Sequence, residues 1–174
     1  LYGNGWLSLD DLKNFRQLHS KTPGHPENFM TKGVECTTGP LGQGAAMSVG
    51  FAVAARHFRE TLDEDLFNYR TYALVSDGDL QEGVALGAAS LAGHLGLGNL
   101  NWVFDSNAIQ LSGPTAETTS DDIARTFESF GWDVCTVDGH DLDALRKGFG
   151  QAKQQMEKPS LIIARTTMGK GCAT

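Results

Sequence analysis

The chain has 174 residues, 40% of them hydrophobic, and a formal net charge of −7 at pH 7. That length and apolar content suit a single domain with a substantial core. The acidic balance argues against nucleic acid as a partner, because such a surface needs clustered Lys and Arg. No apolar run is long enough to span a membrane as a helix.

The three cysteines, Cys36, Cys135 and Cys172, lie far apart in the sequence. Their spacing matches neither a disulfide framework nor a zinc site, and isolated thiols are typical of the reducing cytosol. We therefore expect a soluble cytoplasmic protein. Because the sequence begins with Leu1 and not with Met, it is also consistent with a fragment that has lost a targeting segment.

The first part of the chain combines an amphipathic segment with a long loop. Residues 8–18 place apolar side chains at helical spacing and begin with Ser8 and Asp11 in a variant of the capping box, which predicts a short helix. Residues 19–39 contain three Gly and two Pro without periodicity, which predicts a loop. A loop of that length is usually functional or disordered. His25 lies in it, and a histidine in such a loop is most often a solvated surface residue.

Farther along the chain, helical and extended patterns alternate. Helices are predicted at residues 45–58, 80–95, 120–130 and 142–158, and strands at 71–76, 100–104, 132–137 and 160–166. This alternation predicts an α/β fold with a doubly wound, mostly parallel sheet and helices on both faces. Asp138, His140 and Asp141 follow a strand, and we interpret them as a turn and a helix cap in preference to a metal site.

The stretch from Ala73 to Ser112 carries the polar residues of most interest, since it reads as a βαβ unit. Asp77 and Asn107 would both lie at the carboxyl ends of adjacent parallel strands, the edge at which such sheets bind ligands. Carboxylate and amide oxygens suit Mg²⁺ or Ca²⁺, and Gly78 lets the backbone approach an anion closely. A metal-bridged diphosphate fits this pattern, although an Asp-Gly turn is the plainer interpretation.

The same stretch resembles the thiamine diphosphate-binding motif, and in detail it is similar to transketolase. Similar motifs occur in family order as SDGDLQEG, SLAGHL and DSN within that stretch, and as TPGHPE and TTGPLGQG before it. The resemblance implies thiamine diphosphate and Mg²⁺ (or Ca²⁺) as cofactors. It implies Asp77, Asn107 and the backbone carbonyl of Ile109 as metal ligands, and Gly78 at the diphosphate.

The resemblance also assigns residues before the central stretch. Gly39, Pro40 and Leu41 would contact the middle and the aminopyrimidine end of the cofactor. His25 would line the substrate channel and contact the donor sugar, so it is the catalytic candidate.

The resemblance further implies a dimer, with Glu82 in a carboxylate network near the subunit interface. A Glu in the first turn of a helix is equally well explained by the helix dipole. The sequence departs from the family at three positions. Ser76 replaces the first Gly of the motif, Gly87 replaces an interface Glu, and Ser106 replaces the middle Asp of Asp-Asp-Asn.

The implied activity is transfer of a two-carbon ketol unit between sugar phosphates. Relative to the family, residues 1–174 are expected to form one diphosphate-binding domain, incomplete at both ends. The pyrimidine-binding and C-terminal domains are absent from the sequence, so we expect the chain alone to be inactive and to need a partner. The alternatives are a dihydroxyacetone synthase-like acceptor specificity, a non-catalytic transketolase-like module, or an unrelated nucleotide- or phosphate-binding domain.

Overall fold

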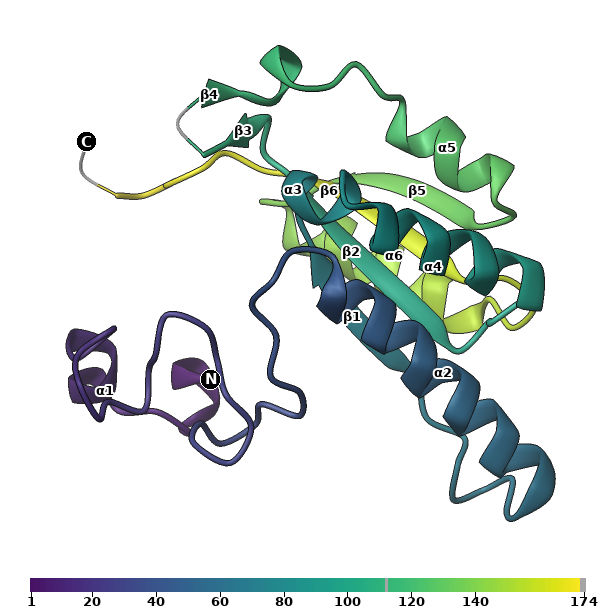
Figure 1. The fold of residues 1–174 in the computed structure, drawn as a ribbon, viewed down its shortest axis with the longest axis horizontal. Coiled ribbons are helices and arrows are strands. Elements are labelled where there is room, and N and C mark those ends of the chain that lie inside the picture. Colours follow the sequence, from purple (N-terminus) through teal and green to yellow (C-terminus); the bar gives the residue numbers. More distant parts are fainter. Residues whose placement is uncertain (112, 173–174) are drawn as a thin grey trace.

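The computed structural model describes residues 1–111 and 113–172, so Ser112 lies outside the described residues. The helices are η1 (Tyr2–Asn4), α1 (Leu9–Lys13), α2 (Gln43–Thr61), α3 (Asp77–Leu80), α4 (Gly83–Leu95), η2 (Thr115–Glu117), α5 (Ile123–Ser129) and α6 (Leu142–Gln154) (Figure 1). The strands are β1 (Thr71–Val75), β2 (Leu100–Ser106), β3 (Ile109–Gln110), β4 (Gly113–Pro114), β5 (Asp133–Asp138) and β6 (Ser160–Arg165).

The four long strands form one parallel sheet in the order β1-β2-β6-β5. Buried side chains on one face belong to a core shared with α2, α4 and α5, and those on the other face pack against α6. Helix α4 connects β1 to β2 across one face of the sheet. Helix α6 connects β5 to β6 across the other face, and this connection moves along the strand order in the opposite direction. Both crossovers therefore have the same hand, as βαβ units require. The predicted doubly wound α/β class is confirmed.

Three aromatic rings hold the larger core together. The ring centroids of Trp102, Phe127 and Trp132 lie between 4.9 and 5.7 Å apart, and such pairs contribute about 0.5–1.5 kcal/mol beyond the burial of their area. Each indole N–H is paired inside the core. Trp102 donates to Ser48 Oγ of α2 and Trp132 donates to the Ala89 carbonyl of α4, both at 2.8 Å. These bonds fix both helices against the sheet.

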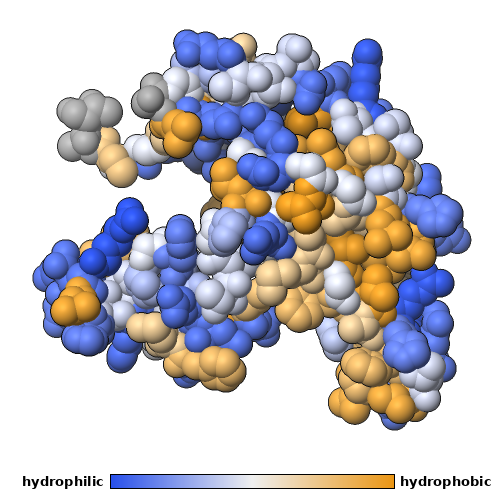
Figure 2. All heavy atoms as spheres, in the orientation of Figure 1, coloured by the Kyte–Doolittle hydropathy of each residue, from blue (hydrophilic) through white to orange (hydrophobic). Residues whose placement is uncertain are grey.

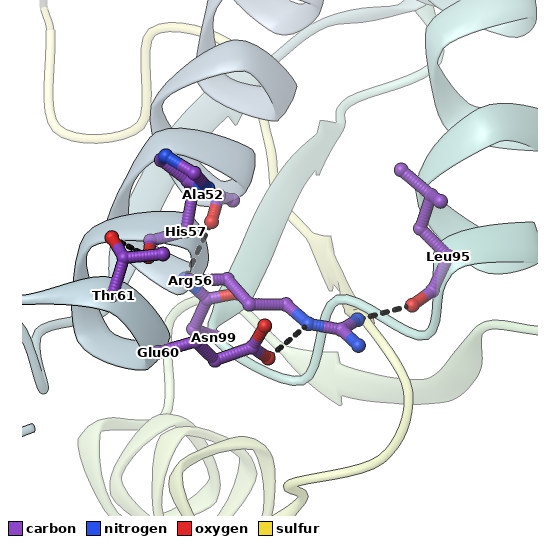
Figure 3. A network of polar contacts seen from close by, with 7 residues as sticks. All are labelled: Ala52, Arg56, His57, Glu60, Thr61, Leu95 and Asn99. Carbon is purple, nitrogen blue, oxygen red and sulfur yellow. Dashed lines mark hydrogen bonds and ion pairs between the residues drawn. The ribbon is translucent and has the colours of Figure 1, made fainter.

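A second polar network ties α2 to α4 at the opposite end of the sheet from the carboxyl edge (Figure 3). Arg56 of α2 donates to the Leu95 carbonyl at 2.7 Å and to Glu60 at 3.1 Å. Asn99, just before β2, donates to the Ala52 carbonyl at 3.0 Å. The guanidinium thereby satisfies a carbonyl at the end of α4 that would otherwise lack a partner.

The first predicted helix is much shorter than its sequence pattern indicates. The pattern extends to residue 18, but α1 ends at Lys13, and Arg16 has a positive φ of 61° that a helix does not allow. The apolar stripe packs on no core, since Leu18 is 86% exposed. Without burial, five residues with a good N-terminal cap are all that remains helical.

Other boundaries also differ from the predicted ones. The helix predicted over 80–95 begins at Gly83 as α4, with Glu82 as its N-cap, and Leu80 instead ends the short helix α3, which occupies the predicted turn at Asp77. The cap expected at Ser120 is formed by Asp122, whose carboxylate accepts from the Arg125 N–H. Among the described residues, no helix combines the length and the apolar content needed to cross a bilayer.

Helix α4 approaches the loop after α5 so closely that one glycine has no room for a side chain. A Cβ at Gly93 would lie 1.8 Å from the Phe130 carbonyl oxygen, whereas one at Gly87 would have no neighbour within 4 Å. We expect Gly93→Ala to lower the free energy of unfolding by about 3 kcal/mol. Gly87→Ala should raise it by up to about 1 kcal/mol, because alanine favours helix. Urea denaturation measures both, and equal effects would contradict this packing.

Candidate functional site

Three segments distant in sequence meet at the carboxyl edge of the sheet. They are residues 39–42 before α2, 76–82 after β1, and 105–110 at the end of β2 and beyond. Val75 pairs with Phe104 in parallel register, so the chain leaves both strands at the same edge. In Figure 2 the surface is hollowed beside α3, between the N-terminal segment and the C-terminal tail. The predicted proximity of the two strand ends is confirmed.

Asp79 joins the first segment to the second. One of its carboxylate oxygens accepts from the Gly42 N–H at 2.9 Å, and the other accepts from the N–H and the hydroxyl of Ser76 at 2.8 Å each. Gly42 is buried and has a φ of 77°, a conformation that glycine adopts without strain. Ser76, where the family motif has Gly, thus turns its hydroxyl toward Asp79 and caps α3.

Close packing brings further predicted residues together in this region. A Cβ added to Gly78 would lie 3.1 Å from Leu41 Cδ1, so the leucine side chain rests against that glycine. In the same way a Cβ at Gly39 would lie 2.9 Å from His25 Nδ1. Pro40 is exposed between these two contacts. Leu41 and Gly78, two of the residues that the family resemblance places at the cofactor, are therefore in contact, and His25 lies against a third, Gly39.

The third segment is folded around the side chain of Asn107. Its Oδ1 accepts from the Ile109 N–H at 2.9 Å, and its Nδ2 donates to Asp105 Oδ2 at 3.1 Å. Ala108 between them has a positive φ of 61°, and Ile109 begins the short β3–β4 hairpin. A tight turn therefore carries the amide and the carbonyl that were predicted as metal ligands.

The hairpin is tied back to α3. The side-chain amides of Gln81 and Gln110 exchange two hydrogen bonds of 2.8 and 3.3 Å. The segment that carries Asp77 is thus linked by side chains both to the loop before α2 and to the hairpin after β2.

The electrostatics of the edge favour a cation. Burial raises the pKa of Asp77, and the charge of Asp105 adds to the effect, while a hydrogen bond from the Asp77 backbone opposes it. A cation at this carboxylate would relieve both penalties. The donor set of one carboxylate, one amide oxygen and one carbonyl is hard, which fits Mg²⁺ or Ca²⁺.

The described residues contain no group of three or more His, Cys, Asp or Glu that could hold a metal. This edge therefore does not provide a complete set of protein ligands for a metal ion. Magnesium commonly uses one or two carboxylates together with ligand phosphates and water. The residues present fit such a shared site.

His25 and Glu82 lie at the margins of this surface. His25 is exposed on the loop that packs against Gly39. Glu82 is the exposed N-cap of α4 rather than a first-turn residue, and its side chain makes no capping bond. A negative charge at the N-terminus of a helix is favoured by the helix dipole, so that explanation of Glu82 still holds.

Sequence reasoning missed several residues that build the edge. Asp79 was detectable, because Ser76 and Asp79 repeat the spacing of Ser8 and Asp11, which form a capping box in α1. The bond from the Thr166 hydroxyl to Asp105 Oδ1 had no signal, since it depends on the pairing of β2 with β6.

The turn after β5 was predicted as a turn and a helix cap, which the structure confirms. Asp138 accepts from the His140 N–H at 2.8 Å, and Asp141 caps α6. The sequence did not indicate that His140 Nε2 would accept from the Thr167 N–H, at 2.8 Å.

Comparison with known proteins identifies the family to which this chain is related. Residues 1–174 match the family described as transketolase, thiamine diphosphate binding domain. The chain is 50% identical to the transketolase of Geobacillus stearothermophilus and 48% identical to transketolase 2 of Escherichia coli, in each case over 95% of its length. The fold and the match define a thiamine diphosphate-binding domain. The chain belongs to the transketolase family.

Solved structures agree with this assignment. The chain superposes on the transketolase of Campylobacter jejuni with a TM-score of 0.89 at 50% identity, covering 95% of this chain and 26% of that one. A Pichia stipitis transketolase mutant in complex with fructose 6-phosphate gives a TM-score of 0.89 at 44% identity, covering 95% and 25%. The chain spans about a quarter of the length of the curated relatives it matches, 25% for each of the two named above.

The bonds of Asp79 generate a prediction about stability. Asp79→Ala removes the cap of α3 and leaves the buried Gly42 N–H without its acceptor, so we expect a loss of about 1–3 kcal/mol in the free energy of unfolding. Asp11→Ala breaks the same kind of capping bond on the exposed helix α1, without a third donor. Asp11→Ala should therefore lower the free energy of unfolding by less than Asp79→Ala does. Thermal and urea denaturation would contradict the linking role if Asp11→Ala were the more damaging variant.

Proposed function

We propose that this chain supplies the thiamine diphosphate- and metal-binding part of a transketolase, which transfers a two-carbon ketol unit between sugar phosphates. The observation that carries the proposal is the convergence of Leu41, Gly78 and Asn107 at one edge of the sheet, in a chain 50% identical to transketolases. The Pichia stipitis relatives whose structures include fructose 6-phosphate and xylulose 5-phosphate support sugar phosphates as the substrate class.

In the proposed site the metal is held by Asp77, Asn107 Oδ1 and the Ile109 carbonyl. Because Asn107 Oδ1 has two lone pairs, it can keep its bond from the Ile109 N–H and still bind a cation. Gly78 admits the diphosphate because no side chain obstructs the backbone there. Leu41, resting on Gly78 and half exposed, presents an apolar surface to the cofactor rings.

Thiamine diphosphate, when bound, supplies the electron sink that ketol transfer requires. The role of the chain is to bind and orient it and to receive the sugar. His25, exposed and resting against Gly39, would hydrogen-bond the donor hydroxyl groups. Because the side chain is exposed, a sugar phosphate can reach it from solvent.

The proposed site is one half of a composite site, completed by a pyrimidine-binding domain on a partner chain or on a further part of the polypeptide. The exposed faces of α2 and α4 support this, because hydrophobic side chains gather over both helices in Figure 2. Phe51 of α2 and Val84 and Leu91 of α4 are each about half exposed. Glu82 stands beside Val84 with its carboxylate exposed. We propose a dimeric or split-subunit assembly through this surface.

The metal assignment predicts that Asp77→Ala abolishes Mg²⁺-dependent binding of thiamine diphosphate. The reason is that Asp77 is the only carboxylate among the three proposed ligands. Isothermal titration calorimetry on the chain assembled with its pyrimidine-binding part measures the affinity. Asp65→Ala, which removes an exposed loop carboxylate, is the control matched for charge. An undiminished affinity for thiamine diphosphate in Asp77→Ala would contradict the assignment of Asp77 as a metal ligand.

The composite-site proposal predicts that the chain alone has no ketol-transfer activity, because one half of the cofactor site is not in its sequence. Assembly with the pyrimidine-binding part should produce turnover of xylulose 5-phosphate with ribose 5-phosphate in a coupled spectrophotometric assay. Turnover by the purified chain alone would refute the composite site. Cofactor binding without turnover in the assembly would favour a non-catalytic module.

A further inference from the structure

The side-chain amide of Asn107 can be a metal ligand only in one of its two orientations. An amide presents an oxygen or an NH₂ group, and the two orientations have nearly the same shape. A ligand residue must keep the oxygen toward the cation. Something in the structure therefore has to distinguish the two ends of the amide.

Two neighbours make that distinction, and they are of opposite character. The Ile109 N–H is a donor and faces Oδ1 at 2.9 Å, whereas Asp105 Oδ2 accepts the hydrogen bond from Nδ2 at 3.1 Å. A flipped amide would place NH₂ against N–H and oxygen against carboxylate. Both contacts would then become repulsive, so the flip is disfavoured twice.

The carboxylate of Asp105 is itself held in place. Its Oδ1 accepts from the hydroxyl of Thr166, the residue that follows β6, so each of its two oxygens has a partner. The Thr166 N–H donates to the Ser106 carbonyl at 3.1 Å, which extends the β2–β6 ladder to this point. The β2–β6 pairing thus holds the Asp105 carboxylate in place through Thr166, and the carboxylate in turn holds the Asn107 amide.

A further hydrogen bond connects this region to the end of β5. The Thr167 N–H donates to His140 Nε2, so the backbone just after Thr166 is anchored to the turn that follows β5. The carboxyl ends of β2, β6 and β5 are therefore joined by side chains in a row.

We propose that Asp105 is a positioning residue that keeps Asn107 Oδ1 directed at the metal, with Thr166 orienting the Asp105 carboxylate. This inference rests on the proposed function, because it needs Asn107 to be a ligand. Partners that orient metal ligands in this way typically contribute about 10–100-fold to metal affinity.

The hydrogen bond to the amide can be tested without metal or cofactor. In ¹⁵N-labelled chain, the Asn107 side-chain amide protons should be shifted downfield and slow to exchange. Asp105→Ala should remove both effects. Asp105→Asn should keep them, because its oxygen can accept from Asn107 while its NH₂ donates to the Thr166 hydroxyl. Unchanged Asn107 signals in Asp105→Ala would overturn the positioning role.

The consequence for the metal is tested in the assembled enzyme by titrating Mg²⁺ at fixed thiamine diphosphate. Asp105→Ala should weaken the apparent Mg²⁺ affinity by about tenfold, and Asp105→Asn should restore it. Because both variants remove the same charge, their difference isolates orientation from electrostatics. Equal weakening in the two variants would overturn the proposal and leave a charge effect.

The two proposals fail in different ways. If Asp77→Ala impairs binding while Asp105→Ala does not, the positioning role is wrong and the proposed function stands. If Asp77→Ala has no effect, the metal assignment fails, and the role of Asp105 fails with it. Should Asp105→Ala not fold, Thr166→Val loses only the hydroxyl that orients the carboxylate. It should weaken Mg²⁺ binding in the same direction, and an unchanged affinity in that variant would overturn the proposal.

Discussion

The parallel pairing of β1 with β2 is the constraint on which the candidate site depends. A parallel connection must return the chain to the amino end of the sheet, so a helix separates two polar segments that end at the same edge. Asp77 and Asn107 are thirty residues apart in sequence, yet their strands are paired residue by residue up to Val75 and Phe104. Trp102, buried between the sheet and α2, holds that pairing from inside the core.

On this rigid base the loops are fixed by a few polar side chains. Asp79 joins the start of α2 to α3, the Gln81–Gln110 pair joins α3 to the hairpin, and Asp105 joins the hairpin to β6. Such bonds pre-organise the surface before any ligand arrives, which reduces the entropy that binding must overcome. The segment that carries His25 lies apart from the sheet in Figure 1 and contacts this surface through Gly39.

The features that could be predicted from the sequence are those that depend on a local pattern of residues. The alternation of apolar runs and helical spacing was enough for the fold class, and the polar residues after two predicted strands were enough to place Asp77 and Asn107 at the same edge of the sheet. The helix over residues 8–18 was overestimated, because its apolar stripe has no core to pack against. The break before Glu82 was missed, because the carboxylate of Asp79 turns back to Ser76 and Gly42, and only the fold shows that Gly42 is there. The contact between Asp105 and Thr166 joins residues on two strands, so no local pattern could indicate it.

The position of β6 has a consequence for how the chain is made. It follows β5 in the sequence, yet it lies between β2 and β5 in the sheet. During synthesis β2 and β5 have no shared neighbour until residues 160–165 leave the ribosome, so the middle of the sheet is filled only after both flanking strands have been made. Until then the buried faces of both strands are exposed to other chains, a condition that favours misassociation. Thr166, which orients Asp105, is made immediately after that strand, so the bond that completes the ligand edge cannot form before the centre of the sheet is available.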